Sequence, residues 1–301
     1  MDKAVIVDRE TGKRYIVSKR TVPFNRFLLP MMKRLFSCVS VFACLALLPF
    51  ASGFAADPAV LSVPVVQPPS GPQGFALYHF EKHSEINGET RLSCDYPVFD
   101  ASPAGDLINK TTLNAIVGVI PAPESAPARL TLEDATTLYL GEYEKVRTSN
   151  KAYIYTWEAM ITGEVLLDRQ TLVTVSIDSY VFTGGAHGMT KTQQLVFDAA
   201  TGKQLVLADF FSPGFESALD QLIERRFRQM KGLTPTEVLN GQKGGLFENA
   251  IHHNENFAVT GSGIRFVYNQ YEIAPYVVGQ IIIDLSFDDL KRVLKPLPEF
   301  K

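Results

Sequence analysis

The stretch that organises the chain reads Tyr180-Val181-Phe182-Thr183-Gly184-Gly185-Ala186-His187-Gly188. It follows the most regular strand pattern of the sequence, residues 172–178, and precedes another strand-like run that ends at Asp198. Three glycines within five residues mark backbone that adopts positive φ or closely approaches another group. The pattern therefore predicts two strands joined by a glycine-rich connection, with His187 in the middle of that permissive backbone.

Working outward, strand-like runs dominate and a few amphipathic stretches separate them. Strands are expected at 76–81, 90–96, 152–157, 160–167, 171–181, 190–197, 256–259, 263–268 and 277–285, and helices at 104–120, 132–146, from Ser212-Pro213 onward, and at 288–294. Short turns between successive strands are typical of an antiparallel meander. The predicted fold class is α+β: antiparallel sheets with packed helices in two subdomains, residues 75–190 and 191–297.

The first 55 residues have the order of an export signal. Lys33-Arg34 is followed by an apolar run from Leu35 to Phe50 and then by small residues, which predicts cleavage after Ala55. A membrane anchor would need about 20 apolar residues, so a cleavable signal is favoured. Because residues 1–30 are long for a basic lead, translation is expected to start at Met31 or Met32.

A mature chain would begin with a proline-rich linker, residues 56–74, which indicates an extended tether. Its expected location is the periplasm or the exterior, with no stable membrane span after signal cleavage. It would keep one cysteine, Cys94, which excludes an internal disulfide and a cysteine-based zinc cluster.

Removing residues 1–55 also changes the charge. That segment holds 9 of the 29 basic and 3 of the 32 acidic residues, which leaves 20 basic and 29 acidic residues and a net charge of −9, against −3 for the whole chain. Such acidity disfavours nucleic acid and favours a cationic partner. Only Arg225-Arg226-Arg228 forms a basic run, on a predicted helix.

The glycine stretch offers the main candidate for catalysis. Asp178 and Tyr180 share a strand face, and the loop could bring His187 back to them, with the Gly184-Gly185 amides as an anion nest. However, the sequence has no serine in a glycine-x-serine-x-glycine turn. A sharp chain reversal in which His187 bonds to the neighbouring loop is the favoured interpretation.

Two histidine pairs are candidate metal ligands. His79 and His83 flank a predicted turn without a third ligand in the sequence nearby, and His252-His253 has only Glu255 beside it. Adjacent histidines generally point in different directions, so exposed histidines are favoured in both places. We expect no metal site and no cofactor.

The loop Tyr271-Glu272-Ile273-Ala274-Pro275-Tyr276 combines two aromatic rings with a carboxylate. Tyr271, Glu272 and Tyr276 suit stacking on a sugar or anchoring of a protein partner. Alternatively, Pro275 stiffens a turn and the tyrosines cover a sheet edge.

Three motifs occur in order along the mature chain. They are Tyr180 with Thr183-Gly184-Gly185-Ala186-His187; Phe197-Asp198 with Thr201-Gly202-Lys203, Leu207 and Asp209-Phe210-Phe211; and Tyr271-Glu272-Ile273-Ala274-Pro275-Tyr276 with Gly279. Together they resemble a paired-domain module of unknown function. The module forms the extracytoplasmic part of RsiV-like anti-sigma factors, which sense lysozyme, and the non-catalytic N-terminal region of PdaC-like peptidoglycan deacetylases. The resemblance spans residues 75–297.

The resemblance implies a fold of two α+β domains and allows lysozyme recognition. An anti-sigma factor would also need a cytoplasmic segment and a membrane span, and a deacetylase would need a further metal-binding catalytic domain. The expected function is therefore an exported, non-enzymatic binding module of the cell envelope that recognises a lysozyme-like cationic protein or a peptidoglycan glycan. The tentative binding residues are Thr183, Gly184, Gly185, His187, Tyr271, Glu272 and Tyr276. The alternative is an envelope hydrolase or deacetylase that uses His187.

Overall fold

The computed structural model describes residues 3–7, 14–18 and 74–296. The expected signal peptide and nearly all of the proline-rich linker lie outside these residues. Ahead of them, β1 (Lys3–Val7) and β2 (Arg14–Ser18) form an antiparallel pair. Within the described residues, no helix combines the length and apolar character needed to cross a membrane.

A five-stranded sheet forms the first half of residues 74–296, and it has the order β3-β4-β5-β6-β7. Its strands are β3 (Phe75–His83), β4 (Arg91–Phe99), β5 (Glu158–Asp168), β6 (Leu172–Phe182) and β7 (Met189–Asp198). All neighbours are antiparallel except β4 and β5, which are parallel. The sheet is therefore antiparallel-dominated, as expected, and β4 and β5 are parallel because two helices intervene and return the chain to the same end of the sheet.

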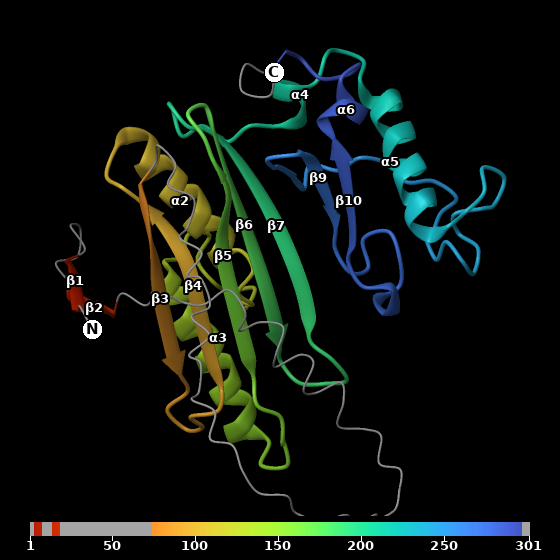
Figure 1. Ribbon diagram of the computed structural model, residues 1–301. Helices are drawn as coiled ribbons and strands as arrows, with labels where there is room; N and C mark the ends of the chain where they lie inside the picture. Colours follow the sequence, from red (N-terminus) through yellow and green to blue (C-terminus); the bar gives the residue numbers. More distant parts are fainter. Residues whose placement is uncertain (1–2, 8–13, 19–73, 297–301) are drawn as a thin grey trace, which may run out of the picture. The chain divides into compact units, whose positions relative to one another are not determined.

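Those helices are α2 (Pro103–Val117) and α3 (Leu132–Ser149), and both cover one face of the sheet (Figure 1). Ser102 caps α2, and Thr131 caps α3 in a reciprocal capping box with Asp134. The apolar side chains that alternate along the strands meet the helices in one core. Its members include Leu92, Ile108, Ile116, Tyr139, Ile161, Val175, Ile177 and Phe197.

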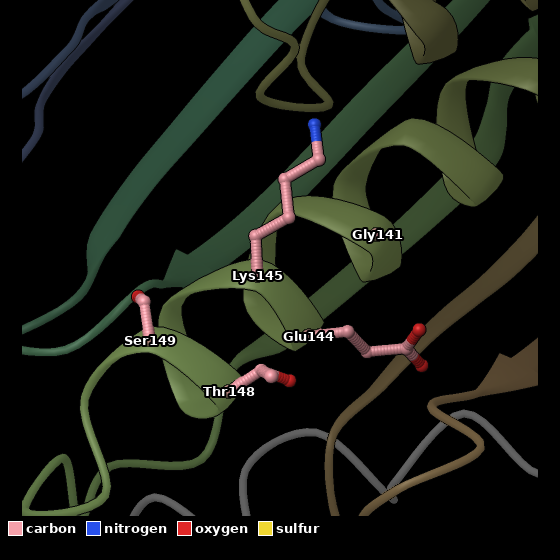
Figure 2. Close-up of a pocket in the computed structure, with 5 residues that line it drawn as sticks. All are labelled: Gly141, Glu144, Lys145, Thr148 and Ser149. Carbon is pink, nitrogen blue, oxygen red and sulfur yellow. The ribbon is translucent and has the colours of Figure 1, made fainter.

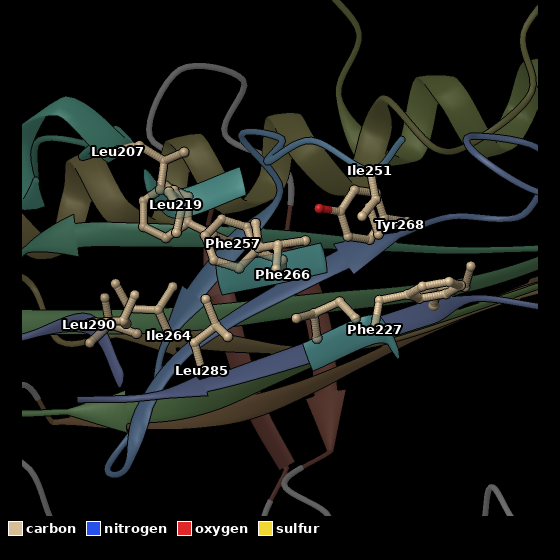
Figure 3. Close-up of a cluster of buried hydrophobic side chains, with 14 of the residues drawn as sticks. Leu207, Leu219, Phe227, Ile251, Phe257, Ile264, Phe266, Tyr268, Leu285 and Leu290 are labelled. Atoms are coloured by element: carbon tan, nitrogen blue, oxygen red, sulfur yellow. The ribbon is translucent and has the colours of Figure 1, made fainter. Parts of the chain in front are cut away.

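The second half contains a three-stranded antiparallel sheet, with the order β10-β9-β8. Its elements are α4 (Leu207–Phe210), α5 (Glu216–Lys231), β8 (Phe257–Val259), β9 (Gly263–Tyr268), a 3₁₀ turn η1 (Tyr276–Val278), β10 (Ile281–Ser286) and α6 (Phe287–Leu290). Figure 3 shows its core, in which Leu219 and Phe227 of α5 and Leu290 of α6 lie among Phe257, Ile264 and Phe266 from β8 and β9. The chain is thus an α+β protein with antiparallel-dominated sheets and packed helices.

Three predicted elements differ from the structure. Residues 152–157 form an irregular loop instead of a strand. The long helix begins at Glu216, because Ser212-Pro213 precedes a turn and contributes no cap. The strand expected at 277–285 begins at Ile281, since Gly279 has a φ of 77° that ends η1, and β10 is an edge strand instead of a central one.

The two halves join along the outer edge of β7. Side-chain amides of the second half take the place of a sixth strand there: Gln270, Asn269 and Asn256 accept hydrogen bonds from the backbone N–H groups of Thr190 (3.0 Å), Thr192 (2.7 Å) and Gln194 (2.8 Å). We call this the amide seam. The subdomain boundary expected between residues 190 and 191 remains a prediction, and β7 crosses it.

Candidate binding surface

The glycine loop 183–188 is the hairpin between β6 and β7. Gly184 and Gly185 have φ values of 95° and 92°, which favour glycine. A side chain at Gly184 would meet the Tyr153 hydroxyl at 2.3 Å, whereas Gly185 faces open space. The loop is therefore the predicted sharp reversal, and a neighbouring loop confines one side of it.

That neighbour is the loop 152–157, for which the sequence pattern predicts a strand. The Tyr153 hydroxyl donates to the carbonyl oxygen of Thr183 (2.9 Å) and accepts from the indole N–H of Trp157 (2.7 Å). Tyr155 packs edge-on against Phe182, with ring centroids 6.1 Å apart. These contacts hold the loop against the end of β6.

On its other side the glycine loop contacts the segment 271–278. The His187 ring stacks on Tyr276 with centroids 3.8 Å apart, and the Tyr276 hydroxyl donates to the carbonyl oxygen of Gly188 (2.9 Å). Tyr271 packs beside Tyr276 at 5.7 Å. Loops 152–157, 183–188 and 271–278 thus form one connected region, which we call the three-loop surface.

Tyr271 has an unusual backbone within this surface. Its φ is 66°, and among the described residues it is the only non-glycine residue with positive φ. Glu272 holds the turn, since its carboxylate accepts from the Asn269 N–H (2.8 Å) and from the Asn254 side chain (2.7 Å). An exposed bulky residue held in a strained conformation favours a functional role for the ring over a role in packing.

The three-loop surface also carries unusual apolar exposure. Among the described residues, the two most exposed large hydrophobic side chains are Val277 (90%) and Ile154 (82%), and Tyr271 is 53% exposed. Segments 152–157 and 183–188 contain no charged residue, and segment 271–278 contains one, Glu272, although one residue in five of the chain is charged. An exposed area that is rich in apolar side chains and poor in charges is typical of a binding interface.

The candidate catalytic residues have separate partners. The Asp178 carboxylate accepts from the Thr192 and Ser176 hydroxyls. Tyr180 lies under Gly188, where an added side chain would meet its ring at 2.5 Å. The polar contact of His187 is with its neighbour Gly188, at 3.1 Å. The expected shared strand face of Asp178 and Tyr180 is present, and His187 contacts the second half of the chain.

The first histidine pair considered as metal ligands, His79 and His83, forms hydrogen bonds within the protein. His79 contacts Asp95 (2.7 Å), and His83 contacts the carbonyl oxygen of Gly88 (2.6 Å). His79 and His83 stand four residues apart on one strand, about 13 Å along its axis, so one ion would not reach both. Among the described residues, no group of three His, Cys, Asp or Glu has metal-binding geometry.

A shallow hollow on α3 is a less suitable binding site than the three-loop surface. It is lined by Gly141, Glu144, Lys145, Thr148 and Ser149, and Figure 2 shows these side chains along one side of the helix. The Glu144 carboxylate is already engaged by the Ser84 hydroxyl (2.8 Å), and Lys145 pairs with Glu142 (2.6 Å). The hollow therefore offers few unengaged groups to a ligand.

Two family models match successive parts of the chain. One, described as "Deacetylase PdaC", matches residues 84–190, and the other, described as "Protein of unknown function (DUF3298)", matches residues 208–288. The two matches follow one another along the chain without overlap. The paired-domain module expected from the sequence motifs is confirmed, and the glycine loop lies near the end of the first match.

Two solved structures of DUF3298 family proteins share the fold of the module. One, from Bacteroides fragilis NCTC 9343, is 24% identical with a TM-score of 0.62, and the match covers 76% of this chain and 96% of that one. The other, from Pseudomonas aeruginosa PAO1, is 21% identical with a TM-score of 0.55, covering 75% and 95%. A search of curated proteins gives no significant match.

On the three-loop surface, the sequence motifs indicate the rings of His187, Tyr271 and Tyr276 but not the apolar side chains of Ile154 and Val277. Ile154 and Tyr155 were assigned to a strand, and Val277 was assigned to a central strand, so neither segment was considered for binding. The spacing gave a signal for the second case, because Gly279 interrupts the apolar run only two residues after Val277.

Proposed function

We propose that the protein is an exported, non-enzymatic binding module of the cell envelope, and that it captures a cationic protein such as lysozyme through the three-loop surface. The observation that carries this proposal is the apolar exposure of Ile154 and Val277 on loops that both domains contribute. Large exposed apolar side chains in an area with few charges are the usual anchors of a protein interface. The proposed location is the periplasm or the exterior.

The charge distribution supports a cationic partner. Residues 75–198 hold 16 acidic and 9 basic residues, whereas residues 199–296 hold 11 and 10. The first domain therefore supplies most of the negative field, and that field would steer a positively charged protein toward the adjoining loops. The partner's apolar side chains would then pack on Ile154, Tyr155 and Val277.

Retention of lysozyme on immobilised mature protein tests the anchors. We expect retention at low and at moderate salt, and we expect Ile154→Ser with Val277→Ser to weaken binding at least tenfold at both. Val206→Ser with Val238→Ser is the matched control, because these valines are also exposed (48% and 50%) but lie elsewhere. If wild type retains no lysozyme at either salt concentration, lysozyme is not the partner. If the two double variants bind lysozyme equally well, the three-loop surface is not the binding site.

The steering field has its own test. Glu85 and Glu89 are exposed in the loop after β3, so replacing both by lysine is expected to slow association and to flatten its salt dependence while leaving dissociation unchanged. Glu216 and Glu248 are exposed in the second half and form the control pair. Equal association rates for the two lysine variants would refute steering by the first domain.

A deacetylase or hydrolase that uses His187 is the second candidate, because the family model that matches residues 84–190 is described as a deacetylase. The separate partners of Asp178, Tyr180 and His187 favour binding over this reaction. Mature protein and His187→Ala are compared on acetylated glycans, peptidoglycan fragments and esters. Turnover by wild type that the variant loses would establish the second candidate and overturn the first.

A further inference from the structure

Four exposed cations gather on the second domain, away from the residues that the proposed function uses. They are Arg225 and Arg226 of α5 and Lys291 and Arg292, which directly follow α6. Helices α5 and α6 pack against each other, and the charges of Arg226 and Arg225 both act on Asp289 of α6. We call these four residues the basic patch.

The third arginine of the sequence run does not belong to this patch. Arg228 donates to the Glu224 carboxylate (2.8 Å) and to the carbonyl oxygens of Thr234 (2.9 Å) and Glu237 (2.6 Å). Its guanidinium therefore ties α5 to the loop that follows. Of the three arginines in the run, Arg228 therefore stabilises the fold through internal hydrogen bonds, whereas Arg225 and Arg226 are exposed.

The four cations of the basic patch outnumber the two carboxylates beside them, Asp288 and Asp289. Within the described residues, Arg225, Arg226 and Arg292 form no salt bridge, and Lys291 lies 3.5 Å from Asp288 in a pair that is mostly exposed. Such pairs contribute little. Met230, four residues after Arg226 and so on the same side of α5, is 47% exposed.

We propose that the basic patch docks the protein onto an anionic phospholipid surface. Guanidinium groups match phosphate oxygens in paired hydrogen bonds, and a flat layer of headgroups can meet four neighbouring cations at once. Met230 adds an apolar side chain that can enter the interfacial region. A long nucleic acid would extend beyond the patch onto the carboxylates of this net acidic chain, which favours the membrane as the occupant.

Co-sedimentation of the mature protein with vesicles tests the proposal. We expect binding to phosphatidylglycerol–phosphatidylcholine vesicles, little binding to pure phosphatidylcholine, and a decline as salt is added. Each basic residue near an anionic leaflet contributes a factor of about five to the partition coefficient. Replacing Arg225, Arg226 and Arg292 by glutamine is therefore expected to reduce binding about a hundredfold.

The control variant removes the same charge at Lys110, Lys151 and Lys203, which are exposed elsewhere. It is expected to bind the anionic vesicles as wild type does. Equal loss in both triple variants, or no binding of wild type to phosphatidylglycerol vesicles, would overturn the proposal. Circular dichroism and melting of all variants exclude a folding defect as the cause, and lysozyme retention by the patch variant shows that the three-loop surface acts independently.

Discussion

At the residue scale, Gly184 and Gly185 illustrate two different requirements for glycine: a positive φ and a lack of space for a side chain. Both have φ near +90°, but only Gly184 lies against a neighbouring group, the Tyr153 hydroxyl. Sequence spacing showed that positive φ was needed somewhere in this loop. It could not show the second reason, because Tyr153 lies 31 residues before Gly184 in a segment that was expected to be a strand.

Gly185→Ala is expected to lower the free energy of unfolding by about 1 kcal/mol, the conformational cost of positive φ. Gly184→Ala is expected to cost about 2–3 kcal/mol, because the new methyl also displaces a hydroxyl that is bonded to Thr183 and Trp157. Urea unfolding of the two variants measures both values. Equal losses would show that the Tyr153 contact contributes nothing.

A second residue-scale prediction concerns Glu164 on β5. Burial raises the pKa of its carboxyl, the nearby Asp178 charge adds to the rise, and Arg265 partly opposes it. Because the folded pKa lies above the unfolded value, wild type loses stability as pH rises through the folded pKa. Glu164→Gln is expected to remove that decline and to stabilise the protein at pH 7 by less than about 1 kcal/mol.

Thermal melting at pH values from below 4 to 7 measures this difference, with Glu248→Gln, an exposed glutamate, as the control. The stabilisation should grow with pH. A Glu164→Gln variant that is less stable than wild type at pH 7 would contradict the prediction.

At the element scale, the loop before β8 is tied to α5 by one carboxylate. Asp220 accepts the backbone N–H of His253 (2.8 Å) and lies within hydrogen-bond distance of Nδ1 of both His252 (2.8 Å) and His253 (2.6 Å). Adjacent histidines in a loop are expected to point apart and to be solvated. They share an acceptor because α5 places Asp220 beside the loop, which no local pattern reveals.

Asp220→Asn is expected to destabilise the protein by about 2 kcal/mol at pH 7. Burial alone would raise the pKa of Asp220, but the hydrogen bonds from His252 and His253 hold it below its usual range. The depressed pKa means that its contribution is present above the unfolded value of 3.8 and is lost as pH falls through the folded pKa. The stability of Asp220→Asn should therefore fall less than that of wild type as pH falls through this range.

Denaturant unfolding across this pH range measures the effect. Glu216→Gln, an exposed carboxylate in the first turn of the same helix, is the control. Parallel stability–pH curves for wild type and Asp220→Asn would show that the histidines do not depend on this carboxylate.

At the scale of the whole molecule, the amide seam couples the two domains. Asn256 and Asn269 accept from the N–H groups of Gln194 and Thr192, and both donate back to the carbonyl oxygen of Thr192 (2.9 and 3.0 Å). Because β7 would otherwise expose an unpaired edge, the seam satisfies that edge and fixes the second domain beside it.

Asn256→Ala with Asn269→Ala is expected to lower stability by about 2–4 kcal/mol, since it leaves backbone groups of β7 without partners. Calorimetry should show one transition for wild type and two for the double variant, because the domains then melt separately. Asn114→Ala on the exposed side of α2 is the control. A single transition at an unchanged temperature would refute coupling through the seam.

The sequence by itself determined the α+β class, the strands around the glycine loop, the helix that begins at Leu132 and the paired-domain module. These features rest on local periodicity, turn residues and short motifs, which act over a few neighbouring positions. Tertiary structure decided the parallel pairing of β4 and β5, the place of β10 at a sheet edge, and the partners of Asp220 and Gly184. It also decided the three-loop surface, because its segments are separated by up to about a hundred residues and meet only when β6, β7 and the second domain pack together.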